Sequence, residues 1–326
     1  MIGSVSSFDI WENLSDMKRL PFTLLALVVL VGCGRGGRPP DANGPLTEAR
    51  RGFQSRLVAR GADREPIPQP PPRLFRLVRY ESPAGKLAAY LTPDPQDGQK
   101  HPAIIWITGG DCNSIDQGCW TEGPPANDQS ASAFRKAGVV MMFPSLRGGN
   151  DNPGTKEGFL GEVDDVVAAA DFLGKQDYVD PKRIYLGGHS TGGTLVLLVA
   201  ECSDRFRAIF SFGPVDDVAG YDPQYLPFDT SNPREIALRS PGWWLTNIKS
   251  PTFVLEGTAQ GNIGSLQTMS RSSTNPNVHF LPVRGANHFS ILAPTTRLLA
   301  AKVVRDDGPT CNLVFTEQEL SKPFAR

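Results

Sequence analysis

Short apolar runs alternate with longer segments of helical spacing over most of this chain. Runs with the length of buried strands lie at residues 86–91, 103–107, 139–143, 184–186, 208–212, 252–255 and 279–283. Stretches with helical character lie at residues 130–137, 162–173, 193–201 and 294–304. Strands that alternate with helices form a mostly parallel sheet with helices on both faces. The pattern therefore predicts one α/β domain over about residues 73–310.

A cluster of glycines around a serine interrupts this pattern between the strand at 184–186 and the following helix. The residues two before and two after Ser190 are Gly188 and Gly192. A serine that a sharp strand-to-helix turn lifts above a sheet has a strained backbone, and little room remains for side chains beside it. We therefore predict that Ser190 is a catalytic nucleophile. The alternative interpretation is an ordinary glycine-rich turn.

Further motifs fit the same kind of enzyme. They are Ile-Thr-Gly-Gly at 107–110, Pro-Ser-Leu-Arg-Gly-Gly at 144–149, Gly-Glu-Val-Asp-Asp at 161–165, and the run at 248–255. With the serine turn, they resemble the α/β-hydrolases, closest to the prolyl oligopeptidase-like serine hydrolases (peptidase family S9) and the related dienelactone hydrolases. The resemblance covers roughly residues 74–305. It implies an α/β-hydrolase fold and a Ser-His-acid triad, and we expect no propeller domain.

A serine hydroxyl is a poor nucleophile until a positioned base removes its proton. His288 follows the last predicted strand, on the loop where this fold places its general base, and is the predicted base. Three other histidines are expected to have no catalytic role. We expect His101 to be exposed before a strand, His189 to point away from the neighbouring serine, and His279 to pack in a strand.

The acid of the triad is where the sequence departs from the family. After the strand at 252–255 the family usually has His-Gly-x-x-Asp, whereas this chain has Glu256-Gly257-Thr258-Ala259-Gln260. Gln260 cannot stabilise an imidazolium with a negative charge. Glu256 stands nearer the strand but is one methylene longer than Asp, so it is the predicted acid. Asp217 and Asp216 are alternatives, and the absence of any acid is a third.

The resemblance also implies an oxyanion hole made by the backbone N–H groups of Thr191 and Gly110. Aromatic residues gather between the strands at 208–212 and 252–255. They are predicted to wall a substrate pocket, although ordinary packing explains them equally well: Tyr221, Tyr225, Phe228, Trp243 and Trp244.

The N-terminus has the pattern of an export signal. Lys18-Arg19 precede an apolar stretch at 20–31 that is too short to span a bilayer but suits the core of a signal peptide. The small residue before Cys33 resembles a bacterial lipobox, in which the cysteine is lipidated. The alternative is a buried hydrophobic element. Acidic residues before Met17 make it a more natural start than Met1.

These predictions divide the chain into consecutive parts. They are a signal peptide at 1–33, a Pro/Gly-rich tether with a possible short helix at 34–72, the hydrolase domain at 73–310 and a C-terminal tail at 311–326. Such a protein would be lipid-anchored in a bacterial cell envelope, facing the periplasm or the exterior.

Four cysteines remain if Cys33 carries lipid, and an even number in an exported protein permits disulfides. Two disulfides have three possible connectivities, and in one of them Cys112 with Cys119 closes a short loop and leaves Cys202 with Cys311. Free buried thiols are the alternative. Their spacing does not resemble a zinc site, so no metal is predicted.

Composition adds little to this picture. Of 326 residues, 40% are hydrophobic and 21% charged, and the net charge of −1 gives no reason to expect nucleic acid. The sequence thus predicts an exported serine hydrolase without a cofactor, which cleaves a small ester or a short peptide through an acyl-enzyme. The alternative is a catalytically degenerate lipoprotein that serves as a binding or envelope-structural module.

Overall fold

The computed structural model describes residues 44–59 and 64–325 of the chain. The predicted signal peptide, the lipobox with Cys33, and both candidate start residues lie outside these described residues. Among the helices of the described part, none is long and apolar enough to span a bilayer.

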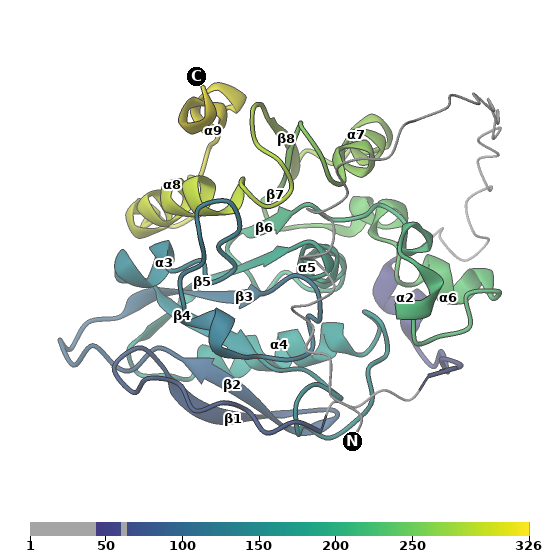
Figure 1. The fold of residues 1–326 in the computed structure, drawn as a ribbon, viewed down its shortest axis with the longest axis horizontal. Coiled ribbons are helices and arrows are strands. Elements are labelled where there is room, and N and C mark those ends of the chain that lie inside the picture. The colour runs from purple at the N-terminus through teal and green to yellow at the C-terminus, as the bar shows by residue number, and fades with distance from the viewer. Residues whose placement is uncertain (1–43, 60–63, 326) are drawn as a thin grey trace, which may run out of the picture. The chain divides into compact units, whose positions relative to one another are not determined.

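A mostly parallel sheet forms the centre of the domain (Figure 1). Its strand order is β1-β2-β4-β3-β5-β6-β7-β8, with β1, β2 and β4 paired antiparallel and the strands from β4 through β3 to β8 paired parallel. The strands are β1 Arg76–Ser82, β2 Gly85–Leu91, β3 His101–Ile107, β4 Val140–Pro144, β5 Val179–His189, β6 Ile209–Phe212, β7 Thr252–Gly257 and β8 Val278–Val283. This is the predicted α/β-hydrolase architecture.

Each predicted apolar run overlaps a strand, but β1 was not predicted. It pairs with β2 at the edge of the sheet, and only Tyr80 of its residues is buried. An edge strand with one buried side chain lacks the continuous apolar run by which a central parallel strand is recognised.

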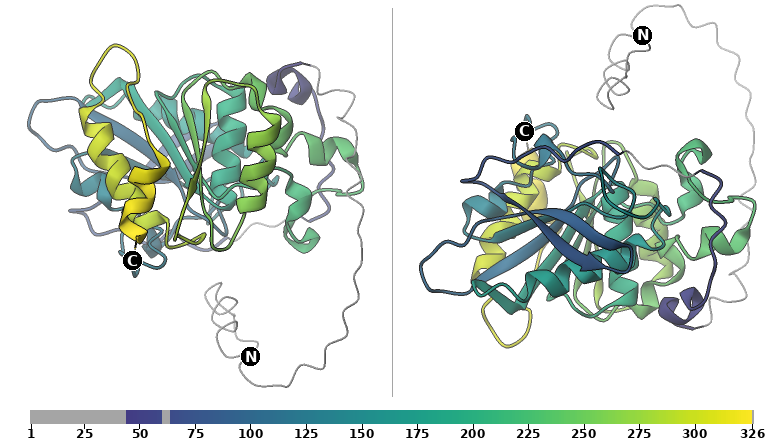
Figure 2. Two further views of the ribbon diagram at one scale, coloured as in Figure 1. Left: turned by 90° about the horizontal axis from the view of Figure 1, so that it is seen from above. Right: turned by 90° about the horizontal axis from the view of Figure 1, so that it is seen from below.

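Helices cover both faces of the sheet, as the views from above and below show (Figure 2). Each face has its own hydrophobic cluster, because successive side chains along a strand point to opposite sides. One cluster receives helices α2, α4, α5 and α7, and the other receives α3, α8 and α9. The helices are α2 Leu46–Arg50, α3 Ala133–Lys136, α4 Glu162–Leu173, α5 Thr191–Cys202, α6 Pro233–Ala237, α7 Ile263–Ser272, α8 Leu292–Arg305 and α9 Glu317–Ser321.

Parts of the expected tether and tail pack onto this domain. In the tether, Leu46 of α2 is buried and its N–H donates to Asn247 Oδ1 over 2.9 Å. In the tail, the Phe315 ring packs edge-on against Phe253, with centroids 4.8 Å apart. Leu320 of α9 is also buried. Apolar side chains at both ends of the described chain therefore complete the core.

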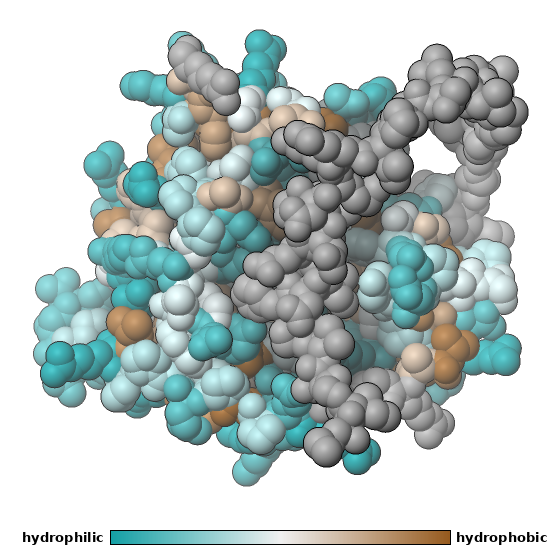
Figure 3. Space-filling model, in the orientation of Figure 1, coloured by the Kyte–Doolittle hydropathy of each residue, from teal (hydrophilic) through white to brown (hydrophobic). Residues whose placement is uncertain are grey.

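The described surface in Figure 3 is mostly hydrophilic, with separate hydrophobic spots. The large apolar side chains that are exposed come from different parts of the described chain: Val58, Tyr225, Val304 and Val314. Single exposed apolar residues are normal for a globular domain.

The four cysteines in the described part are free thiols, so the expected disulfides are absent from this structure. Cys112 packs in the cluster on one face of the sheet, and Cys119 packs in the cluster on the other face. Cys202 and Cys311 are separated in the same way. The two members of each of these pairs therefore pack in different hydrophobic clusters.

A buried acid without a partner interrupts the apolar face of α5. The Glu201 side chain is 3% exposed, and neither carboxylate oxygen has a hydrogen-bond partner among the described residues. Burial raises the pKa of Glu201 well above its usual value, because the charged form loses its hydration. The pKa of Glu201 is therefore higher in the folded state than in the unfolded state. The free energy of unfolding is largest below the unfolded-state pKa, where Glu201 is protonated in both states. It falls as the pH rises from there through the folded-state pKa.

We predict that Glu201→Met stabilises the domain. Methionine has a similar shape and removes the unsatisfied group, which costs about 1–3 kcal/mol when buried. Urea unfolding should show a larger gain at pH 8 than at pH 5, because wild type is relieved by protonation at low pH. Glu65→Met, at an exposed position, is the matched control and should change little. A variant less stable than wild type at pH 8 would contradict this account.

Candidate active site

Ser190 lies between the end of β5 and the start of α5, in the turn that the glycine pattern predicted. Its φ of 56° and ψ of −115° are strained for a residue with a side chain. Its N–H donates to Phe212 O at the end of β6 over 2.8 Å. A Cβ at Gly188 would lie 2.5 Å from Gly192 O, and one at Gly192 would collide with Ile107 O. Both glycines are therefore required by close backbone approach.

His288 and Glu256 are in direct contact. The Nδ1 atom of His288, on the loop between β8 and α8, lies 2.8 Å from Glu256 Oε2 in β7. The Glu256 side chain is fully buried, and its Oε1 accepts the Gly257 N–H over 2.8 Å. Both carboxylate oxygens thus have donors, as a buried charge requires.

The other acid candidates are not in this arrangement. Asp217 Oδ1 accepts from Ala219 N over 2.9 Å and from Ser240 Oγ over 3.0 Å, and so caps a short 3₁₀ helix. Gln260, at the position of the family's acid, is exposed on the loop after β7. Asp216 lies with its backbone O 2.8 Å from Gly242 N. Of the candidates, Glu256 is the one whose contact with His288 the structure records.

The end of β6 brings the serine and the histidine to one place. Gly213 directly follows β6 with a φ of +58°, and a Cβ there would lie 2.5 Å from His288 Cε1 and collide with Glu256 Oε2. The preceding residue, Phe212, accepts the Ser190 N–H. Because Gly213 has no side chain, it leaves room for the His288–Glu256 pair beside the nucleophile turn.

The loop after β3 lies directly against the serine. A Cβ built on Gly109 would lie 3.2 Å from Ser190 Cβ. Thr191 Oγ1 donates to Gly110 O over 2.9 Å, which fixes this loop to the start of α5. Thr191 and Gly110, the predicted oxyanion donors, are thus neighbours in space.

The predicted pocket aromatics divide into two groups. The Tyr221 hydroxyl lies 2.8 Å from Thr194 Oγ1, which donates to Ser190 O over 3.3 Å. Tyr221 also stacks on Phe159, with ring centroids 5.9 Å apart. Phe159 was missed in the sequence, and its φ of 76° is unusual for a bulky residue.

The remaining aromatics lie elsewhere. Trp244 was expected to wall the pocket, but it is 1% exposed and its indole N–H donates to Ala237 O over 2.8 Å. It is part of the core. Trp243 is partly buried against the same core cluster, and Tyr225 is 66% exposed on a short 3₁₀ helix. Phe228 is buried under Arg239, whose guanidinium carbon lies 4.1 Å from the ring centroid.

An ion-pair network holds the loop that carries Phe159. Arg147 Nε and Nη2 donate to the two carboxylate oxygens of Asp165 over 2.8 and 2.9 Å, and Nη1 donates to Glu157 over 2.6 Å. Burial disfavours the charge of Arg147, but these two acids outweigh it and raise its pKa. The Arg-Gly motif therefore has a structural role in shaping the loop between β4 and α4.

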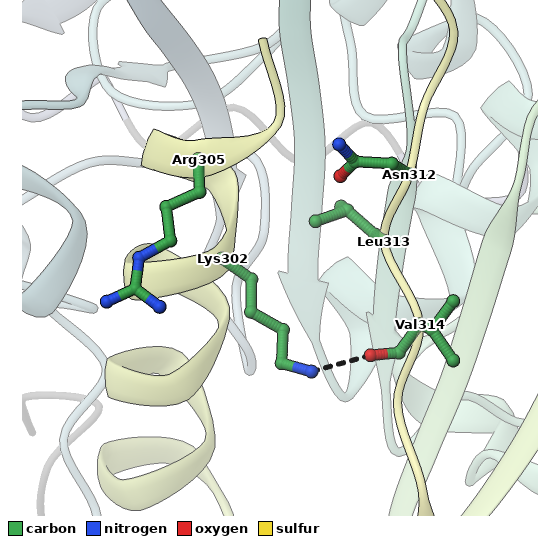
Figure 4. Close-up of a pocket in the computed structure, with 5 residues that line it drawn as sticks. All are labelled: Lys302, Arg305, Asn312, Leu313 and Val314. Atoms are coloured by element: carbon green, nitrogen blue, oxygen red, sulfur yellow. Dashed lines mark hydrogen bonds between the residues drawn. The ribbon is translucent and has the colours of Figure 1, made fainter. Parts of the chain in front are cut away.

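The structure also has a hollow of about 200 Å³, lined by Lys302, Arg305, Asn312, Leu313 and Val314 (Figure 4). Lys302 Nζ donates to Val314 O over 2.6 Å and to Glu319 Oε2 over 2.9 Å, so its charge is already paired. The hollow lies between α8 and the segment that follows it, on elements other than those that carry the serine and the acid. No cluster of three or more His, Cys, Asp or Glu side chains in the described part could hold a metal ion.

Comparison with known proteins finds a family that is similar to this chain. The sequence profile of the prolyl oligopeptidase family matches residues 125–270, which include both Ser190 and Glu256. The match covers less than half of the chain, and it shows that residues 125–270 are similar to the prolyl oligopeptidase family. The resemblance inferred from the sequence motifs is thereby confirmed.

Curated relatives match over a limited length. The dual function macrocyclase-peptidase POPB of Galerina marginata is 34% identical over 89 residues, which is 25% of this chain and 12% of that protein. The chain therefore spans a small part of the length of the curated relatives it matches.

Solved structures match over more of the chain. A puromycin-hydrolyzing peptidase from Mycobacterium tuberculosis has a TM-score of 0.59 at 20% identity, over 74% of this chain and 40% of that one. A hyperthermophilic esterase from Pyrobaculum calidifontis has a TM-score of 0.52 at 15% identity, over 80% and 88%. At these identities the likeness shows the α/β-hydrolase fold alone, and the fold does not select a reaction.

We predict that Glu256→Gln lowers kcat for a p-nitrophenyl ester by about 10³ to 10⁴-fold. The amide cannot stabilise the imidazolium, and it permits the wrong tautomer of His288. Asp217→Asn is the matched control, and because the Asp217 carboxylate caps a short 3₁₀ helix it should cost far less. Steady-state kinetics on both variants decide the matter. A larger loss in Asp217→Asn than in Glu256→Gln would overturn the assignment of the acid.

Proposed function

We propose that this chain is a serine hydrolase that cleaves a peptide or ester bond through an acyl-enzyme. Ser190 is the nucleophile, His288 the general base and Glu256 the acid. The observation that carries the proposal is the 2.8 Å contact between His288 Nδ1 and Glu256 Oε2, beside a serine held in a strained turn. A histidine whose far nitrogen is held by a carboxylate is oriented to accept a serine proton.

The reaction follows from these positions. His288 Nε2 takes the proton of Ser190 Oγ as the oxygen attacks the substrate carbonyl carbon. The oxyanion that forms accepts hydrogen bonds from the N–H groups of Thr191 and Gly110. His288 then gives the proton to the leaving amine or alcohol, which leaves an acyl-enzyme. Water, deprotonated by His288, attacks the ester, and Ser190 recovers its proton as the acid product departs.

The proposed substrate is a short peptide, with a small ester as the second candidate. The similarity of residues 125–270 to the prolyl oligopeptidase family supports a peptide. The likeness to a solved esterase shows that the same fold also occurs in an ester-cleaving enzyme. Both reactions pass through the same acyl-enzyme, so the residues above serve either.

The degenerate-lipoprotein alternative has less support. It rested on Gln260, which stands where the family has its acid. A buried carboxylate from Glu256 in contact with His288 supplies the charge that Gln260 lacks. A protein that had lost catalysis would have no need to keep this carboxylate buried, at a cost in desolvation.

We predict that a fluorophosphonate probe labels wild type covalently and does not label Ser190→Ala. Loss of Ser190 or His288 should each lower turnover by about 10³-fold or more, with little further loss in the double variant, because the two act as a unit. Intact-mass spectrometry and turnover of a p-nitrophenyl ester measure both effects. Equal labelling of wild type and Ser190→Ala would contradict the proposal.

We further propose that the protein is exported and lipid-anchored at Cys33. The apolar stretch at 20–31 and the small residue before the cysteine support this. Cys33→Ser should leave an unprocessed precursor or a soluble form, whereas wild type should fractionate with membranes, because several acyl chains anchor firmly. Mass spectrometry of the expressed protein decides it. A mature chain that retains Met1 and carries no lipid would rule the anchor out.

A further inference from the structure

His189 is buried at the centre of the candidate site, although it takes no part in the proposed reaction. It is the last residue of β5, directly before Ser190, and its side chain has no exposed surface. Its ring centroid lies 4.5 Å from that of His288 and 5.6 Å from that of Phe289. The side chain thus packs against the ring of the proposed general base.

The hydrogen bonds of His189 fix its tautomer. Its Nε2 lies 2.9 Å from the backbone O of His288, and its Nδ1 lies 2.9 Å from Gln129 Nε2. A carbonyl oxygen can only accept, so Nε2 carries the hydrogen, and Nδ1 accepts from the Gln129 amide. Burial, followed by the charge of His288, lowers the pKa of His189 to about 3. The ring is therefore neutral in the range where serine hydrolases work.

Gln129 extends this connection to the loop after β3. Its Oε1 accepts the Gly109 N–H over 3.3 Å, and its Nε2 also donates to Asn127 Oδ1 over 2.8 Å. Gly109 packs on the histidine itself, since a Cβ built there would lie 2.8 Å from His189 Nδ1. A continuous chain of donors and acceptors thus runs from Gly109 through Gln129 and His189 to the backbone of His288.

We propose that His189 is a positioning residue that sets the distance between the general base and the oxyanion loop. Its Nε2–H holds the His288 backbone, and its Nδ1 holds Gln129 and, through it, Gly109. This inference rests on the proposed function. The loop of Gly109 and the loop of His288, which this series of hydrogen bonds connects, carry groups that must act on one substrate carbonyl. A shift of about 1 Å between such groups can cost about 10²-fold in rate.

A neutral ring suits this position better than a charged side chain. His288 becomes an imidazolium during the proposed reaction, and a cation whose ring centre is 4.5 Å away would oppose that charge. His189 supplies a donor to the backbone of His288 without adding a charge beside its ring.

The test compares two near-isosteric variants, His189→Gln and His189→Met. Glutamine can place an N–H donor near the position of Nε2, whereas methionine fills the space without one. We expect His189→Met to lower kcat and the fluorophosphonate labelling rate by about 10- to 100-fold, with KM changed less than about threefold. His189→Gln should stay within about fivefold of wild type. His279→Gln, at an exposed histidine of β8, is the control and should match wild type.

A second variant, Gln129→Met, tests whether the loss in His189→Met comes from misfolding. Gln129→Met leaves His189 in place and cuts the connection to Gly109. It should lower the labelling rate in the same direction by less, and the double variant should be no slower than His189→Met. Rescue by glutamine and this non-additivity are effects that a purely structural histidine would not produce.

The outcomes separate this inference from the proposed function. A wild-type protein that the probe does not label overturns the proposed function and this inference together. A labelled wild type with His189→Met equally fast overturns only the positioning role. The same holds if His189→Gln is as slow as His189→Met, because the donor would then not be what matters.

Discussion

The buried contact between Glu256 and His288 is the constraint on which the site depends. A carboxylate with no exposed surface is stable only with donors, and these are the His288 ring and the Gly257 N–H. To admit the pair, the residue after β6 must lack a side chain, and Gly213 meets that condition. The histidine loop must also follow the strand beside β7, and β8 provides it.

Parallel strand order turns this pairwise contact into a site. The carboxyl ends of β3, β5, β6, β7 and β8 lie at the same edge of the sheet. From that edge come Gly109 after β3, Ser190 after β5, Glu256 near the end of β7 and His288 after β8. The buried His189 connects three of these elements through Gln129 and the His288 backbone. The groups come from β3, β5, β7 and β8, and the sheet sets the spacing of these strands.

Local signals allowed much of this to be predicted. The turn at Ser190 follows from glycine spacing, and the loop position of His288 and the reach of Glu256 follow from the ends of apolar runs. What depends on contacts between distant segments was missed. The sequence could not show that His189, beside the nucleophile, contacts the backbone of His288, 99 residues later. Likewise, the sequence did not indicate that Trp244 belongs to the core, nor that the members of each cysteine pair pack in different clusters.

The central claim is that the Glu256 carboxylate sets the tautomer of His288, and NMR of the ¹⁵N-labelled imidazole measures this directly. In wild-type protein with His288 neutral, the account predicts that Nδ1 carries the hydrogen and Nε2 is free to accept the Ser190 proton. The Nδ1–H signal should be weakened or lost in Glu256→Gln and unchanged in Asp217→Asn. A wild-type spectrum in which Nε2 carries the hydrogen and Nδ1 does not would contradict the account.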